Sequence, residues 1–448
     1  PNGSRFCNLY YLIKEISMSK EENRKNFSKY VSQNILGMIG FSCYVLADSY
    51  FISIAKGADG LTALNLVMPL YSIIFSIGEM IGVGSAIRYA ISKIKKDADA
   101  DDYFWNALIW CIISSMIFVF AGIFFSADIM RVLGADEHIV AVGNNYTKIF
   151  MCFAPMFMCN YVTNAFVRND GAPGIAMSAT LFSSLFNIVF DYILMFPMNL
   201  GMEGAALATA LSPIIGMGIC SIHFFSKKSS VRLVVCKPSV RKLVAGSQLG
   251  VSAFVGEMSS AVITLAFNFV ILKLAGNVGV AAYGVVANIA IVTTAVFNGV
   301  AQGSQPLISS CFGRGDKDGC TQLKRMGYTT AFVLAAVMYS ILFIFAGQFV
   351  AVFNSEGSEM LRLYATEGVK LYFIGIFFAG INIVGGGAFS ATEDAFKAAV
   401  VSVARGFVLI LGAVFVMSAL FGMTGVWLAY AVAEGITTFI MLVMVLRV

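Results

Sequence analysis

The sequence predicts an all-α polytopic membrane protein with twelve transmembrane helices, arranged as two six-helix lobes. Three observations support this: an apolar composition, twelve apolar runs of spanning length, and an internal repeat. Of the 448 residues, 58% are hydrophobic and only 12% are charged, and the mean hydropathy is +0.82. Soluble domains have about 45–50% apolar and about 25% charged residues. Apolar side chains in such excess are tolerated where they face lipid, and there open strands would leave backbone groups unsatisfied, so an all-helical bundle is expected.

Apolar runs of roughly 20 residues, the length that crosses a bilayer, recur along the chain. The first six are expected to form the amino-terminal lobe (N-lobe, 30–226), and they lie at 30–56, 61–92, 103–127, 139–166, 173–198 and 204–226. The second six are expected to form the carboxyl-terminal lobe (C-lobe, 243–448), and they lie at 243–274, 281–311, 323–348, 360–390, 396–420 and 424–447.

Two polar stretches flank the N-lobe. Residues 1–29 are expected to be a cytoplasmic tail, and residues 227–242 a cytoplasmic linker between the lobes. Met18 begins a stretch that resembles a true start, so residues 1–17 are interpreted as a cloning remnant or a misread start.

Basic residues indicate the orientation, because cytoplasmic loops carry the excess of lysine and arginine. They gather in the tail and in the 2–3, 6–7 and 8–9 loops: Lys20, Arg24, Lys25 and Lys29; Lys93, Lys95 and Lys96; Lys227, Lys228, Arg232, Lys237, Arg241 and Lys242; and Arg314, Lys317, Lys324 and Arg325. The alternate loops hold few. Both termini are therefore expected in the cytoplasm.

The halves share short motifs in the same order and at a nearly constant spacing. Gly84-Ser85 recurs as Gly303-Ser304, and the segment 201–208 recurs as 422–429. Six spans separate the copies, and six is even, so both halves run the same way through the membrane. A parallel repeat of this kind is typical of transporters that rock two lobes about a central site. A receptor or channel would fit the composition but not the repeat.

Four carboxylates lie within predicted spans: Asp48, Glu79, Asp191 and Glu257. A carboxylate at the bilayer centre costs about 2.5–3.5 kcal/mol on insertion scales, so each is a functional candidate. Asp48 and Asp191 are the primary candidates, and Glu257 and Glu79 are secondary. The glycines around Glu79 also suggest a purely structural role, in which close helix packing hides the carboxylate against a partner.

Polar partners accompany the primary carboxylates at helical spacing. Asn187 lies four residues before Asp191, and Tyr44 lies four residues before Asp48, so each pair shares a helix face. Such oxygens suit Na⁺, for which Asp48, Asn187 and Asp191 would be the ligands. Alternatively, desolvated carboxylates exchange protons near neutral pH. Both interpretations are consistent with these residues.

Two arginines and a glycine run are interpreted structurally. Arg88 and Arg405 are expected near the cytoplasmic ends of their helices, with their charges reaching water. Glu257 is then the only strong candidate of the second half. The run of Gly385, Gly386 and Gly387 is predicted to be a hinge, because three glycines leave the backbone free to bend.

Several function classes are disfavoured. The chain has no GxxxxGK[ST] phosphate loop and no nucleophile–base motif, so neither ATP-driven transport by this chain alone nor enzymatic activity is expected. Its scattered cysteines and two histidines give no zinc or disulfide pattern. The basic clusters are explained by topology, so no nucleic-acid partner is expected. No cofactor is expected apart from a coupling cation.

From about residue 30 onward the chain resembles the multidrug and toxic compound extrusion (MATE) family, and most closely its bacterial DNA-damage-inducible-F-like branch. The motifs that carry the resemblance are LADSYFI, GADGLTALNLVMPL, RNDGAPGIAM, FNIVFDYILMF, GMEGAALATALS, GVAAYGVVANI, GVAQGSQPLISSCFGRGD and FGMTGVWLAYAVAE. The resemblance implies a monomeric antiporter of the bacterial cytoplasmic membrane, which exports small organic, often cationic, compounds as H⁺ or Na⁺ enters.

The resemblance also implies which residues couple the ion. The branch's N-lobe cluster matches Tyr44, Asp48, Asn187, Asp191 and Thr209. Glu257 matches a glutamate of the other bacterial branch, but that branch's carboxylate in span 10 is replaced here by Gly380. Coupling is therefore expected in the N-lobe. The alternative is a flippase of the same superfamily for lipid-linked oligosaccharide, which would favour a cationic cavity, whereas the in-span charges here are mainly acidic.

Overall fold

The computed structural model describes residues 3–353 and 358–446, and every regular element in these ranges is helical. The first half contains α1 (Gly3–Lys95), α2 (Asp102–Val132), α3 (Glu137–Cys152), α4 (Ala154–Asn169), α5 (Pro173–Met195) and α6 (Gly201–Phe224). The second half contains α7 (Val240–Gly313), α8 (Lys317–Ile344), α9 (Ala346–Phe353), α10 (Glu359–Tyr372), a 3₁₀ turn (Phe373–Gly375), α11 (Ile376–Ala391), α12 (Ala395–Val403), a π turn (Ala404–Val408) and α13 (Leu409–Leu446).

These helices account for the twelve predicted spans. In the described ranges, nine helical stretches are long and apolar enough to cross a membrane, and the bent pair of α3 and α4 makes a tenth. Two of the nine stretches each contain two spans, because α7 is broken at Gly276 and the stretch from α12 to α13 is broken at Gly422. Counting each break gives twelve. The helix α1 is broken in the same way at Gly57 and is already counted as two spans.

The backbone confirms the parallel repeat. Residues in the left-handed region of φ recur at turns in both halves, at nearly the same spacing along the chain. The pairs are Gly57 and Gly276, Lys96 and Gly315, Gly171 and Glu393, and Gly201 and Gly422. Positive φ marks the places where a helix must reverse or stop, and glycine adopts it most readily. Both halves therefore turn at the same points along their six spans.

The fourth span differs from the single run that the sequence predicts. It consists of α3 and α4, which meet at an angle of 46°. Pro155 lies in the first turn of α4. Its ring has no N–H to continue the hydrogen bonding of the preceding helix, so the helix ends there and restarts in a new direction.

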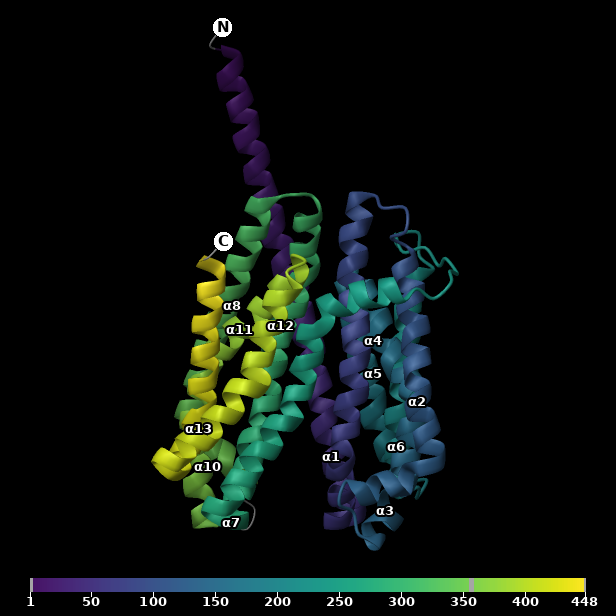
Figure 1. Ribbon diagram of the computed structural model, residues 1–448, viewed down its shortest axis with the longest axis vertical. Coiled ribbons are helices and arrows are strands. Elements are labelled where there is room, and N and C mark those ends of the chain that lie inside the picture. Colours follow the sequence, from purple (N-terminus) through teal and green to yellow (C-terminus); the bar gives the residue numbers. More distant parts are fainter. Residues whose placement is uncertain (1–2, 354–357, 447–448) are drawn as a thin grey trace.

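The two halves form two bundles that lie side by side (Figure 1). Each bundle has its own apolar core: Tyr146, Phe150 and Phe166 are fully buried in the N-lobe, and Phe267 and Trp427 in the C-lobe. The start of the first span does not follow this division. Phe27 and Val31, in the first half of α1, are buried in the core of the C-lobe.

Each lobe packs against a half-helix from the other half of the chain. The start of α7 lies against the second span, where a Cβ added to Gly84 would be 2.1 Å from the carbonyl oxygen of Gly246. The first half of α1 lies against the second half of α7, where a Cβ added to Gly303 would be 2.8 Å from Cα of Val31. Gly84 and Gly303 are equivalent positions of the repeat. Each lobe thus receives the first half-helix of the other.

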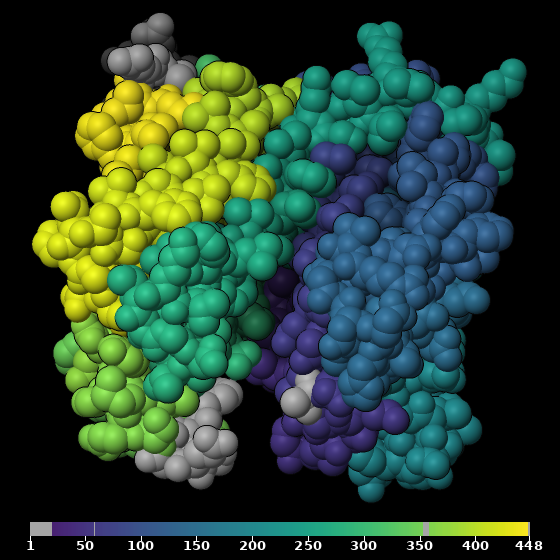
Figure 2. Space-filling model, turned by 60° about the horizontal axis from the view of Figure 1, so that its bottom comes forward, coloured from purple at the N-terminus to yellow at the C-terminus, as the bar shows by residue number. Residues whose placement is uncertain are grey.

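Both crossings lie at one end of the molecule, which we call the basic end because it carries the lysine- and arginine-rich loops. There the lobes also meet through polar contacts: Glu393 pairs with Arg88 and with Lys95, whose Nζ lies 3.5 Å from Oε2 of Glu393. At the opposite end, which we call the open end, the lobes are parted (Figure 2). The molecule is closed at the basic end and open at the other.

Candidate functional site

The predicted polar residues of the N-lobe come together in its interior. Asp48 lies in the second half of the first span in α1, Asn187 and Asp191 lie on α5, and Thr209 lies on α6. The exposed fractions of Asp48, Asn187, Asp191 and Thr209 are 6%, 0%, 0% and 1%. The amide of Asn187 links two of them: its nitrogen donates to Oδ2 of Asp191 at 3.1 Å, and its oxygen accepts from Oγ1 of Thr209 at 3.1 Å. Tyr44, half-buried, lies near both carboxylates.

The carboxylates of this cluster are not fully satisfied. Oδ1 of Asp48 and Oδ1 of Asp191 are both buried and have no hydrogen-bond partner among the residues that the structure describes, and the two carboxylates are close enough for their charges to repel. Buried polar atoms in proteins are nearly always paired, and an unpaired buried charge is expensive. A proton or a cation shared by the two side chains would relieve this cost. Their role in ion coupling remains a prediction.

The donor set limits how a metal ion would bind. Within residues 3–353 and 358–446, no group of three or more histidine, cysteine, aspartate or glutamate side chains is placed to hold a metal ion. A Na⁺ ion would therefore take its remaining ligands from amide and hydroxyl oxygens, such as those of Asn187, Thr209 and Tyr44. These are hard oxygen donors of the kind that Na⁺ accepts.

A pair of tyrosines adjoins the two carboxylates. The hydroxyl groups of Tyr71 and Tyr146 lie 2.5 Å apart, and the ring of Tyr71 stacks on Phe150 with centroids 3.6 Å apart. Both tyrosines are buried, and both lie near Asp48. Sequence reasoning missed this pair, because Tyr71 and Tyr146 are far apart in the chain and share no motif.

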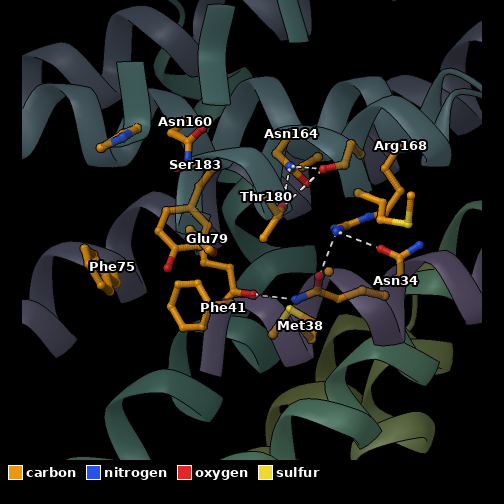
Figure 3. Close-up of a pocket in the computed structure, with 18 of the residues that line it drawn as sticks. Asn34, Met38, Phe41, Phe75, Glu79, Asn160, Asn164, Arg168, Thr180 and Ser183 are labelled. Carbon is orange, nitrogen blue, oxygen red and sulfur yellow. Dashed lines mark hydrogen bonds between the residues drawn. The ribbon is translucent and has the colours of Figure 1, made fainter. Parts of the chain in front are cut away.

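A cavity opens beside the cluster, with a volume of about 1010 Å³ when space open to solvent is included. Its wall comes mainly from α1, α4, α5 and α6, and combines aromatic side chains with amides and hydroxyls (Figure 3). Phe41, Phe75 and Phe157 line it together with Asn160 and Asn164. An apolar wall with a few polar groups is typical of a site for small organic molecules.

Glu79 lies in this wall and takes part in a bridge between the lobes. Nε2 of Gln302, on α7, donates to Oε1 of Glu79 at 3.0 Å, and Nη1 of Arg168 donates to Oε1 of Gln302 at 2.7 Å. Arg168 also contacts Asn34 at 3.5 Å, the long limit of a hydrogen bond (Figure 3). Sequence reasoning found Glu79 but missed the other two, because Arg168 follows the predicted span 139–166 and Gln302 is a neutral residue inside the span 281–311.

Glu257 lies where two cavities meet. It is half-buried on α7 and lines both the N-lobe cavity and a second one of about 550 Å³, again counting open space, which extends into the C-lobe. Glu79 and Gln302 line both as well. The secondary candidates therefore lie between the lobes, apart from the Asp48–Asp191 cluster.

The expectation for Arg405 was wrong. Its guanidinium is not at a helix end but lies inside the C-lobe, where Nε and Nη2 donate to Oε1 of Glu434 at 3.0 and 2.9 Å. Nδ2 of Asn382 donates to Oε2 of Glu434 at 2.7 Å. Glu257 is thus not the only strong candidate of the second half. Glu434 could have been found, because it is a carboxylate well inside the predicted span 424–447.

The three-glycine run lies in a regular part of α11, with no break in helical geometry at these residues. A Cβ added to Gly385 would be 2.3 Å from the sulfur of Met441, and one added to Gly387 would be 3.2 Å from Nε2 of Gln305. In this state the glycines permit close packing. The hinge at Gly385, Gly386 and Gly387 stays a prediction.

Comparisons with known proteins agree with this architecture. The sequence model of the MatE family matches residues 34–193 and 253–416. The multidrug export protein MepA of Staphylococcus aureus (strain MRSA252) is 27% identical over 414 residues, covering 90% of this chain and 89% of the relative. MepA of Staphylococcus saprophyticus is 26% identical over 405 residues, with the same coverage.

Solved structures show the same fold at 20% identity. An outward-facing multidrug resistance MATE transporter of the MOP superfamily superposes with a TM-score of 0.88, covering 95% of this chain and 96% of that one. A MOP superfamily transporter from Pyrococcus furiosus superposes with a TM-score of 0.87, covering 94% and 95%. Two lobes of six spans and a family match over most of the chain lead to one conclusion: this multi-pass membrane protein belongs to the MatE family of transporters.

Proposed function

We propose that this protein exports small organic compounds across the bacterial cytoplasmic membrane in exchange for H⁺ or Na⁺. The staphylococcal relatives named for multidrug export support the export of such compounds. The cavity beside the Asp48–Asp191 cluster supports it as well, because its volume and its aromatic wall suit a small organic molecule.

One observation carries the coupling part of the proposal. Asp48 and Asp191 lie near each other in the interior, and each has an oxygen without a partner. Loading the pair with a proton or Na⁺ removes the repulsion and satisfies the free oxygens. Because the cavity wall includes Tyr44, one turn from Asp48, a change of charge at the pair alters the wall that holds the cargo.

The first span of α1 can transmit ion binding to the contact between the lobes. Asp48 lies on the outer half of the first span, whereas the beginning of the same span is buried in the C-lobe core at Phe27 and Val31. A shift of α1 on ion binding therefore acts on the crossing at the basic end. With the basic loops in the cytoplasm, the open end faces outward, and the ion enters there as the cargo leaves.

The flippase alternative receives less support. An anionic, phosphate-containing cargo would need free cations in the cavity. The wall of the N-lobe cavity offers the acidic Glu79 and Glu257, while its buried Arg168 already donates to Gln302.

The test is transport in proteoliposomes. Ethidium efflux would be driven separately by an imposed pH gradient and an imposed Na⁺ gradient, for the wild type and for the variants Asp48→Asn and Asp191→Asn. We expect one gradient to drive efflux in the wild type, and either variant to reduce that efflux to background. The control is Asp128→Asn, at an exposed surface ion pair with Arg131. Full gradient-driven efflux in both cluster variants would refute the proposed coupling site.

A further inference from the structure

The C-lobe holds a buried carboxylate that the proposed coupling does not use. Glu434, on α13, is 2% exposed. Both of its side-chain oxygens have partners: Oε1 accepts twice from Arg405, and Oε2 accepts from Asn382. Thr438 in turn donates to Oδ1 of Asn382 at 3.0 Å, and Tyr430 lies near Arg405. The carboxylate is saturated by donors of this chain.

The contrast with the N-lobe is chemical. There, two carboxylates share an interior and each lacks a partner for one oxygen. In the C-lobe, one carboxylate and one guanidinium form a neutral pair. Arginine stays protonated in proteins and presents a planar fork of donors to a carboxylate. A carboxylate with its charge and both oxygens paired in this way gains little from binding a proton or a cation.

The backbone at Arg405 is specialised. Arg405 lies in the π turn of residues 404–408, between α12 and α13. A π turn adds one residue to a helical turn, and such turns are frequent at functional sites. Arg405 and Asn382 also line the second cavity, which extends into the C-lobe. The Arg405–Glu434 pair therefore lies beside the space between the lobes and not deep in the apolar core.

The internal repeat shows that this pair belongs to the C-lobe alone. At the spacing of the repeat, the equivalent of Glu434 is Pro213 and the equivalent of Asn382 is Asn160. Positions 183 and 184, which correspond to Arg405, are serines. The N-lobe therefore carries neutral groups at these sites, and all of them line its cavity.

We propose that Arg405 acts as a tethered cation: its guanidinium is permanently bound to the carboxylate of Glu434, at the position where an exchangeable ion would otherwise bind. This inference rests on the proposed function and extends it: the Asp48–Asp191 pair loads and unloads an ion, whereas the charge of the Arg405–Glu434 pair stays constant through the transport cycle. Arg405 is thus a positioning residue that keeps Glu434 from acting as a second coupling site.

The test separates the C-lobe from the N-lobe. In the background Asp48→Asn with Asp191→Asn, the N-lobe pair cannot load an ion. Thermal unfolding of the purified protein would be followed at pH 5 and pH 8, with Na⁺ or N-methylglucamine at equal ionic strength. We expect Arg405→Met in this background to gain several degrees of stabilisation from acid or from Na⁺. Adding Glu434→Gln should abolish the gain, and Arg405→Lys should never show it.

The opposite result is equally clear. If the background protein with Arg405 intact is already stabilised by Na⁺ or acid, and Glu434→Gln removes that response, Glu434 binds an exchangeable ion and the proposal is wrong. If Arg405→Met gains no response that depends on Glu434, the proposal is also wrong.

A second measurement holds even where Arg405→Met does not fold. The double variant Arg405→Met with Glu434→Gln, made in the otherwise wild-type chain, removes the charges together, which is far better tolerated than removing one. We expect it to export with the wild-type number of ions per substrate, measured from reversal potentials. A changed ratio would overturn the proposal. Failure of the wild type to transport on either gradient would instead count against the proposed function, and the unfolding test would still decide on Arg405.

Discussion

Arg168 of the N-lobe donates to Gln302 of the C-lobe at 2.7 Å, and the amide nitrogen of the same Gln302 donates to Glu79 of the N-lobe at 3.0 Å. One neutral side chain therefore lies between two buried opposite charges of the other lobe. In the proposed transport cycle the lobes part at the basic end, so Gln302 would leave while Glu79 and Arg168 stay together in the N-lobe.

Replacing Gln302 with leucine should favour the state in which the basic end is open. It removes two hydrogen bonds to charged groups, each worth about 1.5–3 kcal/mol, so we expect the equilibrium to shift by at least roughly tenfold. Spin labels placed on the two lobes at the basic end would report the distance. The control is Gln305→Leu, one turn further along α7, because Oε1 of Gln305 is buried without a partner. A shift of the same size in Gln305→Leu would contradict this role of Gln302.

Gly84→Ala should block closure of the basic end. The new methyl group would lie 2.1 Å from the carbonyl oxygen of Gly246 and 2.7 Å from the amide nitrogen of Gly250, and backbone atoms cannot rotate away. Overpacking typically costs about 1–3 kcal/mol, which falls here on the state that is closed at the basic end. We expect ethidium efflux to be lost while expression persists. Gly284→Ala, on α7 with no atom within 4 Å of the new Cβ, should export normally.

Gly57→Ala should destabilise the fold without touching a neighbour. Gly57 has φ 59° and ψ −142°, which is accessible to glycine but strained for alanine. Such strain costs about 1–3 kcal/mol, so the unfolding temperature should fall. Gly218→Ala, inside α6 and also free of contacts, should raise it, because alanine is the better helix former by about 0.5–1 kcal/mol. Equal shifts in the two variants would show that backbone conformation at Gly57 is not limiting.

Asp170→Asn should loosen the linker between the lobes. The carboxylate of Asp170 is buried, pairs with Nε2 of His223 at 2.8 Å, and accepts from Oγ of Ser229 at 3.1 Å and from the amide of Ser230 at 2.9 Å. A neutral amide cannot accept all these donors. We expect trypsin to cut after Lys227 or Lys228 about tenfold faster, since one lost charge-assisted bond is worth about 1.5 kcal/mol or more. Asp128→Asn should leave the cleavage rate unchanged, and an unchanged rate in Asp170→Asn would show that the linker is held elsewhere.

The fold was predictable because each segment that crosses the lipid must be a long, continuous run of apolar residues. Apolar runs of spanning length predicted the twelve spans, and the repeated Gly84-Ser85 and 201–208 motifs predicted the parallel repeat that the backbone turns confirm. The bend within span 4 was less visible, because Pro155 lies inside a continuous apolar run and proline occurs in straight spans too. The exchange of half-helices was not visible at all, since a run of hydrophobic residues does not say which bundle it packs against.

The candidate site was predictable only where polar residues share one helix. The four-residue spacing of Asn187 and Asp191 indicated a common face, and the structure places them in contact. The Arg405–Glu434 pair joins residues 29 positions apart on different spans, and the Arg168–Gln302 contact joins positions 134 apart. No periodicity connects such positions, so sequence reasoning places an in-span arginine at the water interface by default.

The exchange of half-helices also makes each half of the chain depend on the other. Each bundle is completed by a segment encoded in the other half of the gene: Phe27 and Val31 fill the core of the second bundle, and Gly246 and Gly250 close against the first. A half made alone would lack the half-helix that completes its bundle and would expose the glycine surface that receives it. Neither half is therefore expected to be stable by itself, and separately expressed halves should be stable only as a pair.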